Sequence, residues 1–369
     1  MKVPLSKVYT DQELKDRVCK VIDSGTFILG PECKAFEAEL AQWLGKKHVV
    51  LISNATSAAQ LCFTALGIGA GDEVMTVAHT AFPTIEAIFG CGATPVFIDV
   101  DDTYCMDPAW LESRITRRTK AINPVHLYGH PCDMDAIQAV AKKHGLLVVE
   151  DCAQAHGAKY KGKTVGTMGV AGTFSFYPSK NLPVLGDGGA VATDDAALAQ
   201  KIRMLRDHGR SDKYTHQIAG YNMRFNEIQA ATGRWFLSRL EKSNDRRREA
   251  AAMYTKRLSA IPGLKCPTEK EWARAVYHLY VIRVKDRDAL AKKLEAKGIG
   301  TGVHYPLPNH LQPGTVNDRR VRAEALPATE SASKEILSLP IFPTITDQEV
   351  EYVCDAVAEH YGALATSKA

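Results

Sequence analysis

The sequence predicts an α/β fold, in which a large domain is built on a mostly parallel central sheet and a smaller α+β domain follows at the C-terminus. Three observations lead to this prediction. Short apolar runs alternate with helical patterns along the first part of the chain, which is the order that βαβ units require. At 369 residues the chain is longer than one hydrophobic core usually serves. A long charged helix begins near residue 240, so we expect domains at residues 1–240, with the N-terminal arm, and 241–369.

Each element follows from its own periodicity. In the segment DQELKDRVCKVID, residues 11–23, apolar side chains recur at helical spacing until Ser24-Gly25 ends the pattern. Further helices are expected within residues 24–45, after residue 54, and at 132–145, 197–206, 240–258, 287–298 and 346–360. Buried strands are expected where short apolar runs are bounded by turn residues, at 47–53, 73–78, 94–101, within 116–130, and at 146–149, 171–176 and 275–284.

The composition is that of an ordinary globular enzyme. Hydrophobic residues make up 45% and charged residues 24% of the chain, and no apolar run approaches the length of a membrane span. The 46 basic residues nearly balance the 42 acidic ones, which argues against nucleic acid as a partner. The nine cysteines are scattered singly, so we expect reduced thiols, a cytoplasmic location and no membrane association.

Residues 145–189 carry the predicted chemistry. Their apolar start predicts a buried strand that ends on Asp151, and a second strand pattern, residues 171–176, is followed by Pro178 and Lys180. Open α/β sheets bind ligands at the C-terminal ends of their strands, so both groups are expected at one crevice. An amine can hold an aldehyde as a Schiff base and a carboxylate can keep a pyridine nitrogen protonated, which is the chemistry of pyridoxal phosphate (PLP). An isolated Asp and Lys are more often a loop cap and a solvated side chain, so the surroundings decide.

The surrounding motifs resemble those of a known family. EDCAQAHGA at residues 150–158, SFYPSKNL at 175–182, GDGGAVATDD at 186–195 and NEIQAATG at 226–233 occur in the order found in the DegT/DnrJ/EryC1/StrS sugar aminotransferases. The resemblance extends from about residue 30 to about residue 343. It implies the fold-type-I architecture of aspartate aminotransferase, PLP as the cofactor, and transamination as the reaction.

The resemblance also implies roles for individual residues. Lys180 would form the Schiff base with the cofactor, and Asp151 would pair with the pyridinium nitrogen. Gln154 would contact the ring on its hydroxyl side, and Ser175 would bind the phosphate. A dehydrating branch of the family has histidine in place of this lysine, so Lys180 favours an aminotransferase.

A further phosphate contact is expected where the strand at residues 47–53 runs into NATS, residues 54–57, at the start of a helix. Hydroxyl groups and free amides at a helix start form an anion site, although N-capping by Ser53 or Asn54 explains the same residues. The resemblance favours phosphate binding at Thr56, with Ser57 beside it.

The chain departs from the family at the position where an aromatic side chain commonly stacks on the cofactor ring, because Ala81 stands there. His79 and Phe82 are the alternatives, and His79 is the residue that we expect to stack. The competing interpretation is a histidine packed in the core.

Other implied contacts involve a second subunit and the substrate. The resemblance places Asn222 against the cofactor phosphate of the neighbouring subunit, so a homodimer with shared active sites is expected. Arg224 is a candidate contact for acidic groups of the substrate, with a solvated side chain as the alternative. His304, Tyr305 and His310 belong to HYPLPNHLQP, a segment of the kind that faces the substrate cleft in similar proteins.

No metal is expected. His126 and His130 lie in VHLYGHP, near Cys132 and Asp133, at a strand end on the predicted ligand side. The same segment is usual in the resembled family and needs no ion.

The expected reaction moves an amino group from L-glutamate to a nucleotide-linked ketosugar for amino-sugar and polysaccharide synthesis, such as that of lipopolysaccharide. The VHLYGHP and HYPLPNH segments resemble members that act on 3-keto sugars more than those that act on 4-keto sugars, and the nucleotide stays open between dTDP and UDP. A UDP-linked 3-oxo uronic acid is an alternative if Arg224 and a second basic group meet a sugar carboxylate. A PLP-binding regulator without turnover is an alternative of another class. A nicotinamide dehydrogenase is disfavoured because no G-x-G-x-x-G follows a strand.

Overall fold

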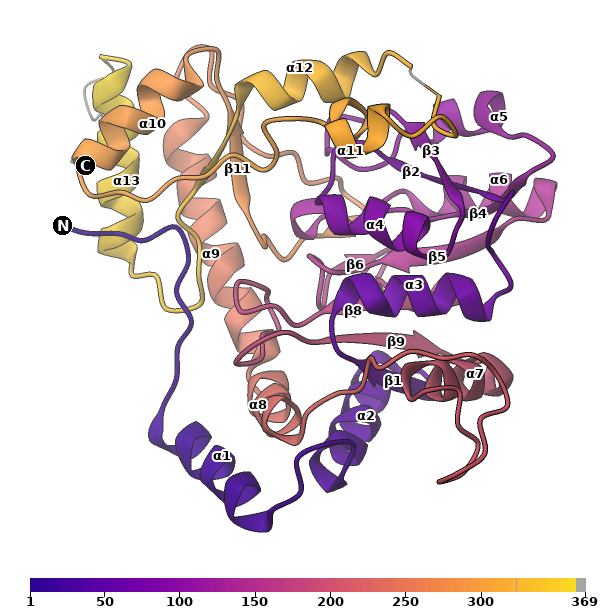
Figure 1. The fold of residues 1–369 in the computed structure, drawn as a ribbon. Coiled ribbons are helices and arrows are strands. Elements are labelled where there is room, and N and C mark those ends of the chain that lie inside the picture. Colours follow the sequence, from indigo (N-terminus) through magenta and orange to yellow (C-terminus); the bar gives the residue numbers. More distant parts are fainter. Residues whose placement is uncertain (323, 363–369) are drawn as a thin grey trace.

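The computed structural model describes residues 1–322 and 324–362 and is built around a seven-stranded sheet (Figure 1). Its strands follow the order β1-β9-β8-β5-β4-β2-β3. Neighbours from β8 to β3 are parallel, whereas β9 runs antiparallel to both β8 and β1, so the predicted mostly parallel sheet is confirmed. The strands are β1 (His48–Ile52), β2 (Glu73–Val77), β3 (Thr94–Ile98), β4 (Thr119–Ile122), β5 (Leu147–Asp151), β8 (Ala171–Ser175) and β9 (Gly189–Thr193).

Helices cover both faces of this sheet. Val49 and Leu51 of β1 pack with α2 (Pro31–Leu44) and α8 (Glu227–Leu237), whereas Val50 and Ile52 pack with α3 (Ala55–Ala65) and α7 (Ala196–Arg206). Successive side chains of a strand point to opposite faces, so a strand covered on both sides is apolar along its buried length, as β1 is at residues 49–52. The remaining helices of this part are α1 (Gln12–Ser24), α4 (Phe82–Gly90), α5 (Leu111–Arg114) and α6 (Met134–His144).

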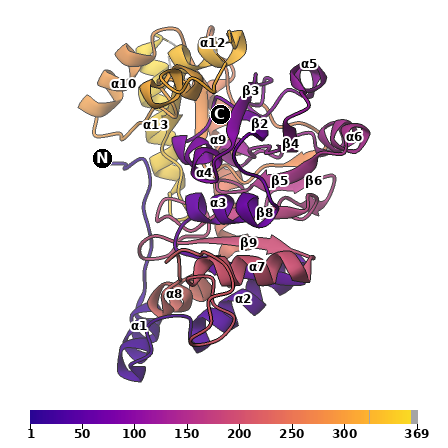
Figure 2. The same cartoon turned by 45° about the vertical axis from the view of Figure 1, so that its right-hand side comes forward.

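The C-terminal part has its own core. The long helix α9 (Leu240–Leu258) starts against the core that contains α2 and ends in a second core with the strand pair β11 (Tyr280–Arg283) and β12 (Ile336–Leu339). The second core also contains side chains of α10 (Arg287–Ala296), α13 (Asp347–His360) and the N-terminal residue Val3. In Figure 2 the helices α10, α12 and α13 lie at the opposite end of the molecule from α1, α2 and α8.

Short elements complete the described part of the chain. The strands β6 (Lys159–Tyr160), β7 (Lys163–Thr164) and β10 (Ala273–Arg274) form a small sheet, and α11 (Pro313–Val316) and α12 (Pro327–Glu335) follow the C-terminal loop. Leu326, just before α12, packs against Phe97 of β3, so this loop returns to the large sheet. The predicted domain boundary coincides with the start of α9 and stays a prediction.

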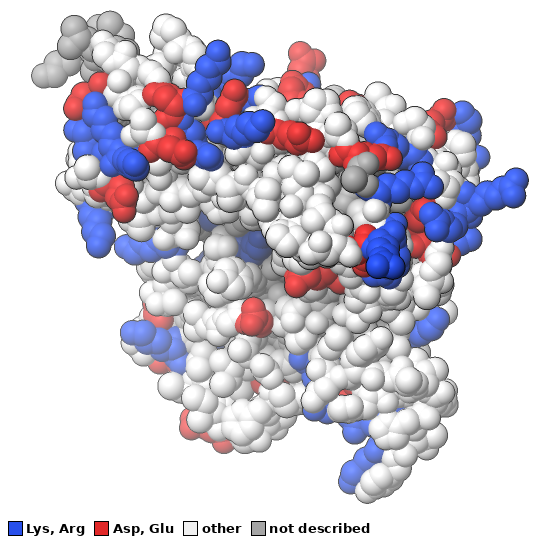
Figure 3. All heavy atoms as spheres, turned by 45° about the horizontal axis from the view of Figure 1, so that its top comes forward, with Lys and Arg blue, Asp and Glu red and all other residues white. Residues whose placement is uncertain are grey.

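In Figure 3 charged side chains of both signs lie side by side along the upper part of this face, and the lower part is mostly uncharged. Within the described residues, none of the helices combines the length and the apolar character that a membrane span needs.

Candidate active site

A cavity of about 490 Å³ lies at the C-terminal ends of β5 and β8, next to the first turn of α3. This is the crevice where parallel α/β sheets bind ligands. Most of the predicted cofactor contacts meet here, since the lining includes Thr56, Ser57, Asp151, Gln154, Ser175 and Lys180.

The start of α3 forms one wall of the cavity. Asn54 caps the helix, because its side-chain oxygen accepts a hydrogen bond from the Ser57 amide at 2.8 Å. The first amides of a helix have no acceptor within the helix, and the helix dipole adds positive potential there. A Cβ on Gly189 of β9 would collide with the backbone of Asn54 and Ala55, so glycine allows this close approach of strand and helix. Capping and anion binding are therefore compatible. The Asn54 side chain caps the helix, whereas Thr56 and Ser57 line the cavity where an anion would bind.

Asp151 is the last residue of β5 and lines the cavity, and two hydrogen bonds from the protein hold its carboxylate. Its Oδ1 accepts a hydrogen bond from the Ala153 amide at 3.0 Å, and its Oδ2 accepts one from the Thr84 hydroxyl at 2.9 Å. Thr84 lies in the first turn of α4 and also lines the cavity. The sequence analysis missed Thr84, although the motif HTAFPT contains it.

Lys180 lies in the loop after β8 and lines the same cavity as Asp151. Burial lowers the pKa of Lys180 to about 8, and the negative charge of Asp151 limits the fall. A desolvated amine of this kind is neutral, and hence nucleophilic, in a much larger fraction near neutral pH than an exposed lysine is.

Gln154 connects the cavity to the C-terminal part. Its side-chain oxygen accepts from the Tyr128 amide at 2.8 Å, and its nitrogen donates to the Tyr305 hydroxyl at 3.1 Å. The Tyr128 hydroxyl in turn donates to the carbonyl of His304, whose ring bonds Ser338 Oγ at 2.8 Å. Two predicted substrate contacts, His304 and Tyr305, are thus brought next to a predicted cofactor contact.

His79 and His310 are buried in the interior, and, like His304, they do not line the cavity. His79 is fully buried, its Nε2 is 2.7 Å from the Tyr128 hydroxyl, and burial lowers its pKa to about 4. His310 is also buried and bonds Glu330 at 3.2 Å. Ala81 does line the cavity, so the position expected to stack on a ring carries only a methyl group there.

Arg224 and Asn222 also lie away from this cavity. The Arg224 guanidinium is paired with Asp207 at 3.1 Å. Asn222 is exposed, on a short antiparallel bridge with Asp207, and lines no part of the cavity of its own chain.

His126, the first of the candidate metal ligands, already has hydrogen-bond partners in the protein. His126 Nδ1 accepts from the Cys132 amide at 2.9 Å, which leaves Nε2 to donate to Glu150 at 3.1 Å. Among the residues described, His126, Glu150 and Cys152 are the His, Cys and carboxylate groups close enough together to hold an ion. Hydrogen bonds already engage both nitrogens of His126, so nothing in their geometry requires a metal.

The chain is similar to known proteins over nearly its whole length. Residues 8–358 match the model of the DegT/DnrJ/EryC1/StrS aminotransferase family. A pleiotropic regulatory protein of Geobacillus stearothermophilus is 44% identical, with 98% of this chain and 99% of that protein covered. A dTDP-3-amino-3,4,6-trideoxy-alpha-D-glucose transaminase of Streptomyces venezuelae is also 44% identical, over 93% of this chain and 90% of that protein. A crystal structure of S. venezuelae DesV in complex with a ketimine intermediate superposes with a TM-score of 0.94 at 42% identity, covering 98% of this chain and 99% of that one.

Proposed function

The chain belongs to the DegT/DnrJ/EryC1/StrS aminotransferase family, and on that premise we propose that it uses PLP to move an amino group from L-glutamate to a 3-keto group of a nucleotide-linked sugar. Its sheet order and the match to the DesV structure give it the fold of a fold-type-I PLP transferase. The observation that carries the proposal is a partly buried amine, Lys180, that shares a cavity with Asp151 and a helix N-terminus.

The residues present fit the cofactor. The first turn of α3, with Thr56 and Ser57, and the end of β8, with Ser175, supply hydroxyl and amide donors for a phosphate. Asp151, supported by Thr84, supplies a carboxylate for a pyridinium nitrogen. When bound, PLP supplies an electron sink for the carbon that carries the amino group.

The protein's own groups then divide the work. Lys180 is the base that takes and returns the proton at the carbon bearing the nitrogen, because its pKa of about 8 suits proton transfer near neutral pH. Asp151 supplies the negative charge that keeps the ring cationic. Gln154 donates a hydrogen bond to the Tyr305 hydroxyl at 3.1 Å, and this bond holds the Gln154 side chain in position beside the cofactor ring.

The proposal of a 3-keto sugar as the acceptor rests on the similarity to the S. venezuelae transaminase, whose name specifies a 3-amino product. We favour dTDP over UDP on the same ground. The uronic-acid alternative depends on Arg224 meeting a sugar carboxylate, whereas Arg224 is already paired with Asp207. We therefore propose a neutral sugar ring. The nine cysteines are free thiols, which suits a reducing cytoplasm.

We also propose that the working unit is a homodimer. Asn222 is exposed and does not reach the cavity of its own chain, which suits a residue that completes the cavity of a neighbour. Phe27 and Ile28 are large apolar side chains and are about half exposed, at 48% and 47%, on the loop between α1 and α2. These two adjacent side chains are available to an apolar contact with a second subunit.

The test is spectroscopic. The purified, PLP-loaded protein should be yellow, and its visible band should move to shorter wavelength on addition of L-glutamate and return on addition of a dTDP-linked 3-ketosugar. Borohydride should leave a pyridoxyl group on Lys180, identified by peptide mass analysis. A pyridoxyl group on another residue, or none, would contradict the assignment. A protein that binds PLP but shows no band change with any amino donor would be a regulator of the kind that one relative's name describes.

A further inference from the structure

The helix α9 carries three arginines in succession, Arg246, Arg247 and Arg248, and the three differ in their surroundings. Arg246 is paired with Asp347 at 2.6 Å and with Glu249 at 3.2 Å. Arg248 is paired with Glu269 at 2.6 Å. Arg247 lies between them with its side chain in the interior, only 3% exposed, and has no carboxylate within ion-pair distance in residues 1–322 and 324–362.

The hydrogen bonds of Arg247 use one side of its guanidinium. Nη1 donates to the carbonyls of Tyr277, His278 and Ile341 at 3.1 to 3.3 Å. Nε is buried and without a partner, and Nη2 makes no hydrogen bond to a described residue either. The guanidinium has five N–H donors, and those of Nη2 are the ones that a bound carboxylate can engage, because Nε is enclosed by the protein. Arg247 therefore keeps unused donors at Nη2.

Arg247 lines a second cavity, of about 690 Å³, that adjoins the first one at Lys180. The other walls are the N-terminal arm at residues 6–9, the loop at residues 178–183, the loop at Pro343, the end of α8 and the first turns of α9. The second cavity thus leads from the surface to the amine at which the reaction occurs.

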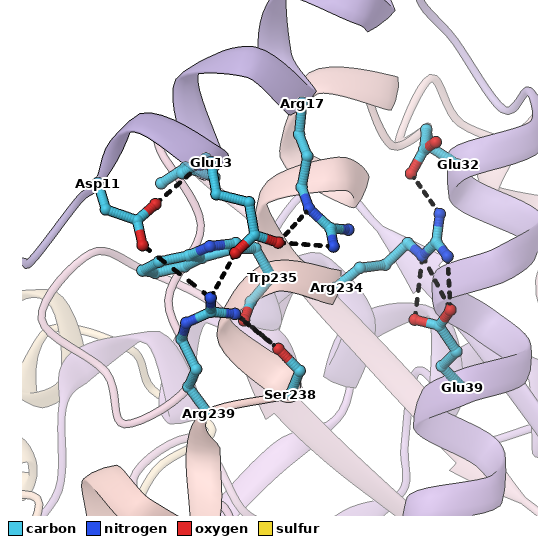
Figure 4. Close-up of polar contacts among 10 residues, drawn as sticks. Asp11, Glu13, Arg17, Glu32, Glu39, Arg234, Trp235, Ser238 and Arg239 are labelled. Atoms are coloured by element: carbon cyan, nitrogen blue, oxygen red, sulfur yellow. Dashed lines mark hydrogen bonds and ion pairs between the residues drawn. The ribbon is translucent and has the colours of Figure 1, made fainter.

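The wall formed by the arm is held by α1. Figure 4 shows Arg239 beside the Trp235 ring and joined to Asp11 and Glu13 at the acidic start of α1. Its guanidinium lies 4.0 Å from the centre of the Trp235 ring and pairs with Glu13 at 2.6 Å. Arg239 and Arg246 also line the second cavity, but their charges are balanced by acids of the protein.

A buried guanidinium without a counter-charge is unfavourable, because burial removes its hydration and no nearby carboxylate replaces it. Burial lowers the pKa of Arg247 to about 10. The same positive charge acts on a neighbour, since burial and then the charges of Lys180 and Arg247 hold the pKa of His278 well below its ordinary value. Lys180 and Arg247 line the same cavity, and an anion bound there would balance both charges.

We propose that Arg247 binds the carboxylate of the amino donor and so distinguishes the donor from the sugar. This inference rests on the proposed function. The carboxylate of an amino acid is attached to the carbon that bears the nitrogen, so it must lie close to Lys180 whenever that carbon reacts. The phosphates of a nucleotide sugar are attached at C1, several bonds from a 3-keto carbon, so they would lie farther from Lys180 than the donor carboxylate does. Arg247 is thus a specificity residue for the donor half of the reaction.

The experiment compares Arg247→Met with Arg248→Met in the full-length, PLP-loaded protein. Arg248 is the matched control, because it is the next residue of the same helix but is paired with Glu269 and does not line the second cavity. Binding of maleate, an unreactive dicarboxylate, and of dTDP and UDP is measured by calorimetry. The glutamate dependence of the visible-band change and its reversal by the ketosugar are measured on the same samples.

We expect Arg247→Met to weaken maleate binding and to raise the glutamate concentration needed for half-maximal band change by about 10- to 100-fold, the range for losing a hydrogen bond to a charged group. Nucleotide binding and the reversal by the sugar should stay at the level of the wild type, and Arg248→Met should leave maleate binding unchanged. If Arg247→Met melts at a lower temperature, Arg247→Lys is measured instead, since lysine keeps the positive charge but lacks the planar guanidinium. That variant should also bind maleate more weakly and nucleotide normally.

Two outcomes overturn the inference. Unchanged maleate and glutamate binding in both Arg247 variants would leave Arg247 with only its structural contacts to the three carbonyls. Weakened nucleotide binding with normal maleate binding would assign the site to a phosphate instead. A wild-type protein that does not respond to glutamate at all would contradict the proposed function itself, which is a separate result.

Discussion

Two adjacent acids at the end of β5 have opposite surroundings. Glu150 is fully buried and accepts hydrogen bonds at 2.7 Å from each of the amides of Gly166, Met168 and Gly169, and it is bonded to His126 at 3.1 Å. Burial acts to raise the pKa of Glu150, but these bonds outweigh it and the pKa is lowered. Asp151, one residue later, has two bonds to the protein and lines the cavity.

The difference teaches how to separate structural from functional polar groups in this molecule. Glu150 uses its acceptor capacity to fix the loop at residues 166–169, so no ligand is needed to satisfy it. Asp151 keeps capacity for a ligand. Burial alone does not make this distinction, since both side chains are largely buried. What separates them is whether the protein already supplies the partners.

The largest expected effect is that of Lys180→Ala, which removes the amine from the cavity where Asp151 lies. Turnover should fall by at least about 10³-fold, because a nucleophile and proton-transfer group is lost. The fold should be retained, since no salt bridge of Lys180 contributes to it in the described structure. The measurement is transamination rate, with far-ultraviolet circular dichroism as the control. Activity close to that of the wild type would show that the cavity is not the site of the chemistry.

Replacing Asp151 and Glu150 one at a time tests directly whether the two acids differ in role. Asp151→Asn should lower the rate by on the order of 10²-fold or more with little loss of stability, because the charge facing the ring is removed while the shape is kept. Glu150→Gln should instead lower the stability and have little effect on the rate. It places an amide against backbone N–H donors and should lower the free energy of unfolding by about 2 to 4 kcal/mol, measured by urea denaturation. If both variants lost mainly stability, Asp151 would be a structural acid like Glu150.

Asn222 extends the comparison to an exposed group. Its side chain makes no hydrogen bond within the described chain, so in the proposed dimer it is available to a phosphate of the neighbouring site. Asn222→Ala should weaken PLP binding by about 10-fold, the effect of one hydrogen bond to a charged group. Equilibrium dialysis of the apoprotein measures it, and sedimentation shows whether the dimer persists. Unchanged PLP affinity in a dimer would argue against a shared site.

Much of the fold and of the site could be predicted from the sequence, because buried strands such as HVVLI and the stretch at residues 145–189 carry strong local patterns. Strand β9 was not predicted, since its sequence GAVAT contains small residues that fit close to α3 and have low strand propensity. Thr84 was missed because its bond to Asp151 joins segments far apart in the chain. The burial of His79 and of His310 depends on packing between elements, which no local pattern contains.

The smallest effect, and the sharpest test of the comparison, is on the titration of Lys180 in the cofactor-free protein. Trace labelling with acetic anhydride over a range of pH, followed by quantitation of the Lys180 peptide, should give a midpoint near pH 8, since burial lowers this pKa to about 8. The negative charge of Asp151 raises that pKa, so Asp151→Asn should move the midpoint to lower pH. Glu150→Gln should leave it in place, because the acid that raises the pKa of Lys180 is Asp151, whereas Glu150 does not line the cavity and is held by hydrogen bonds from His126 and three amides. Equal shifts from both exchanges would mean that the two acids act on the cavity alike.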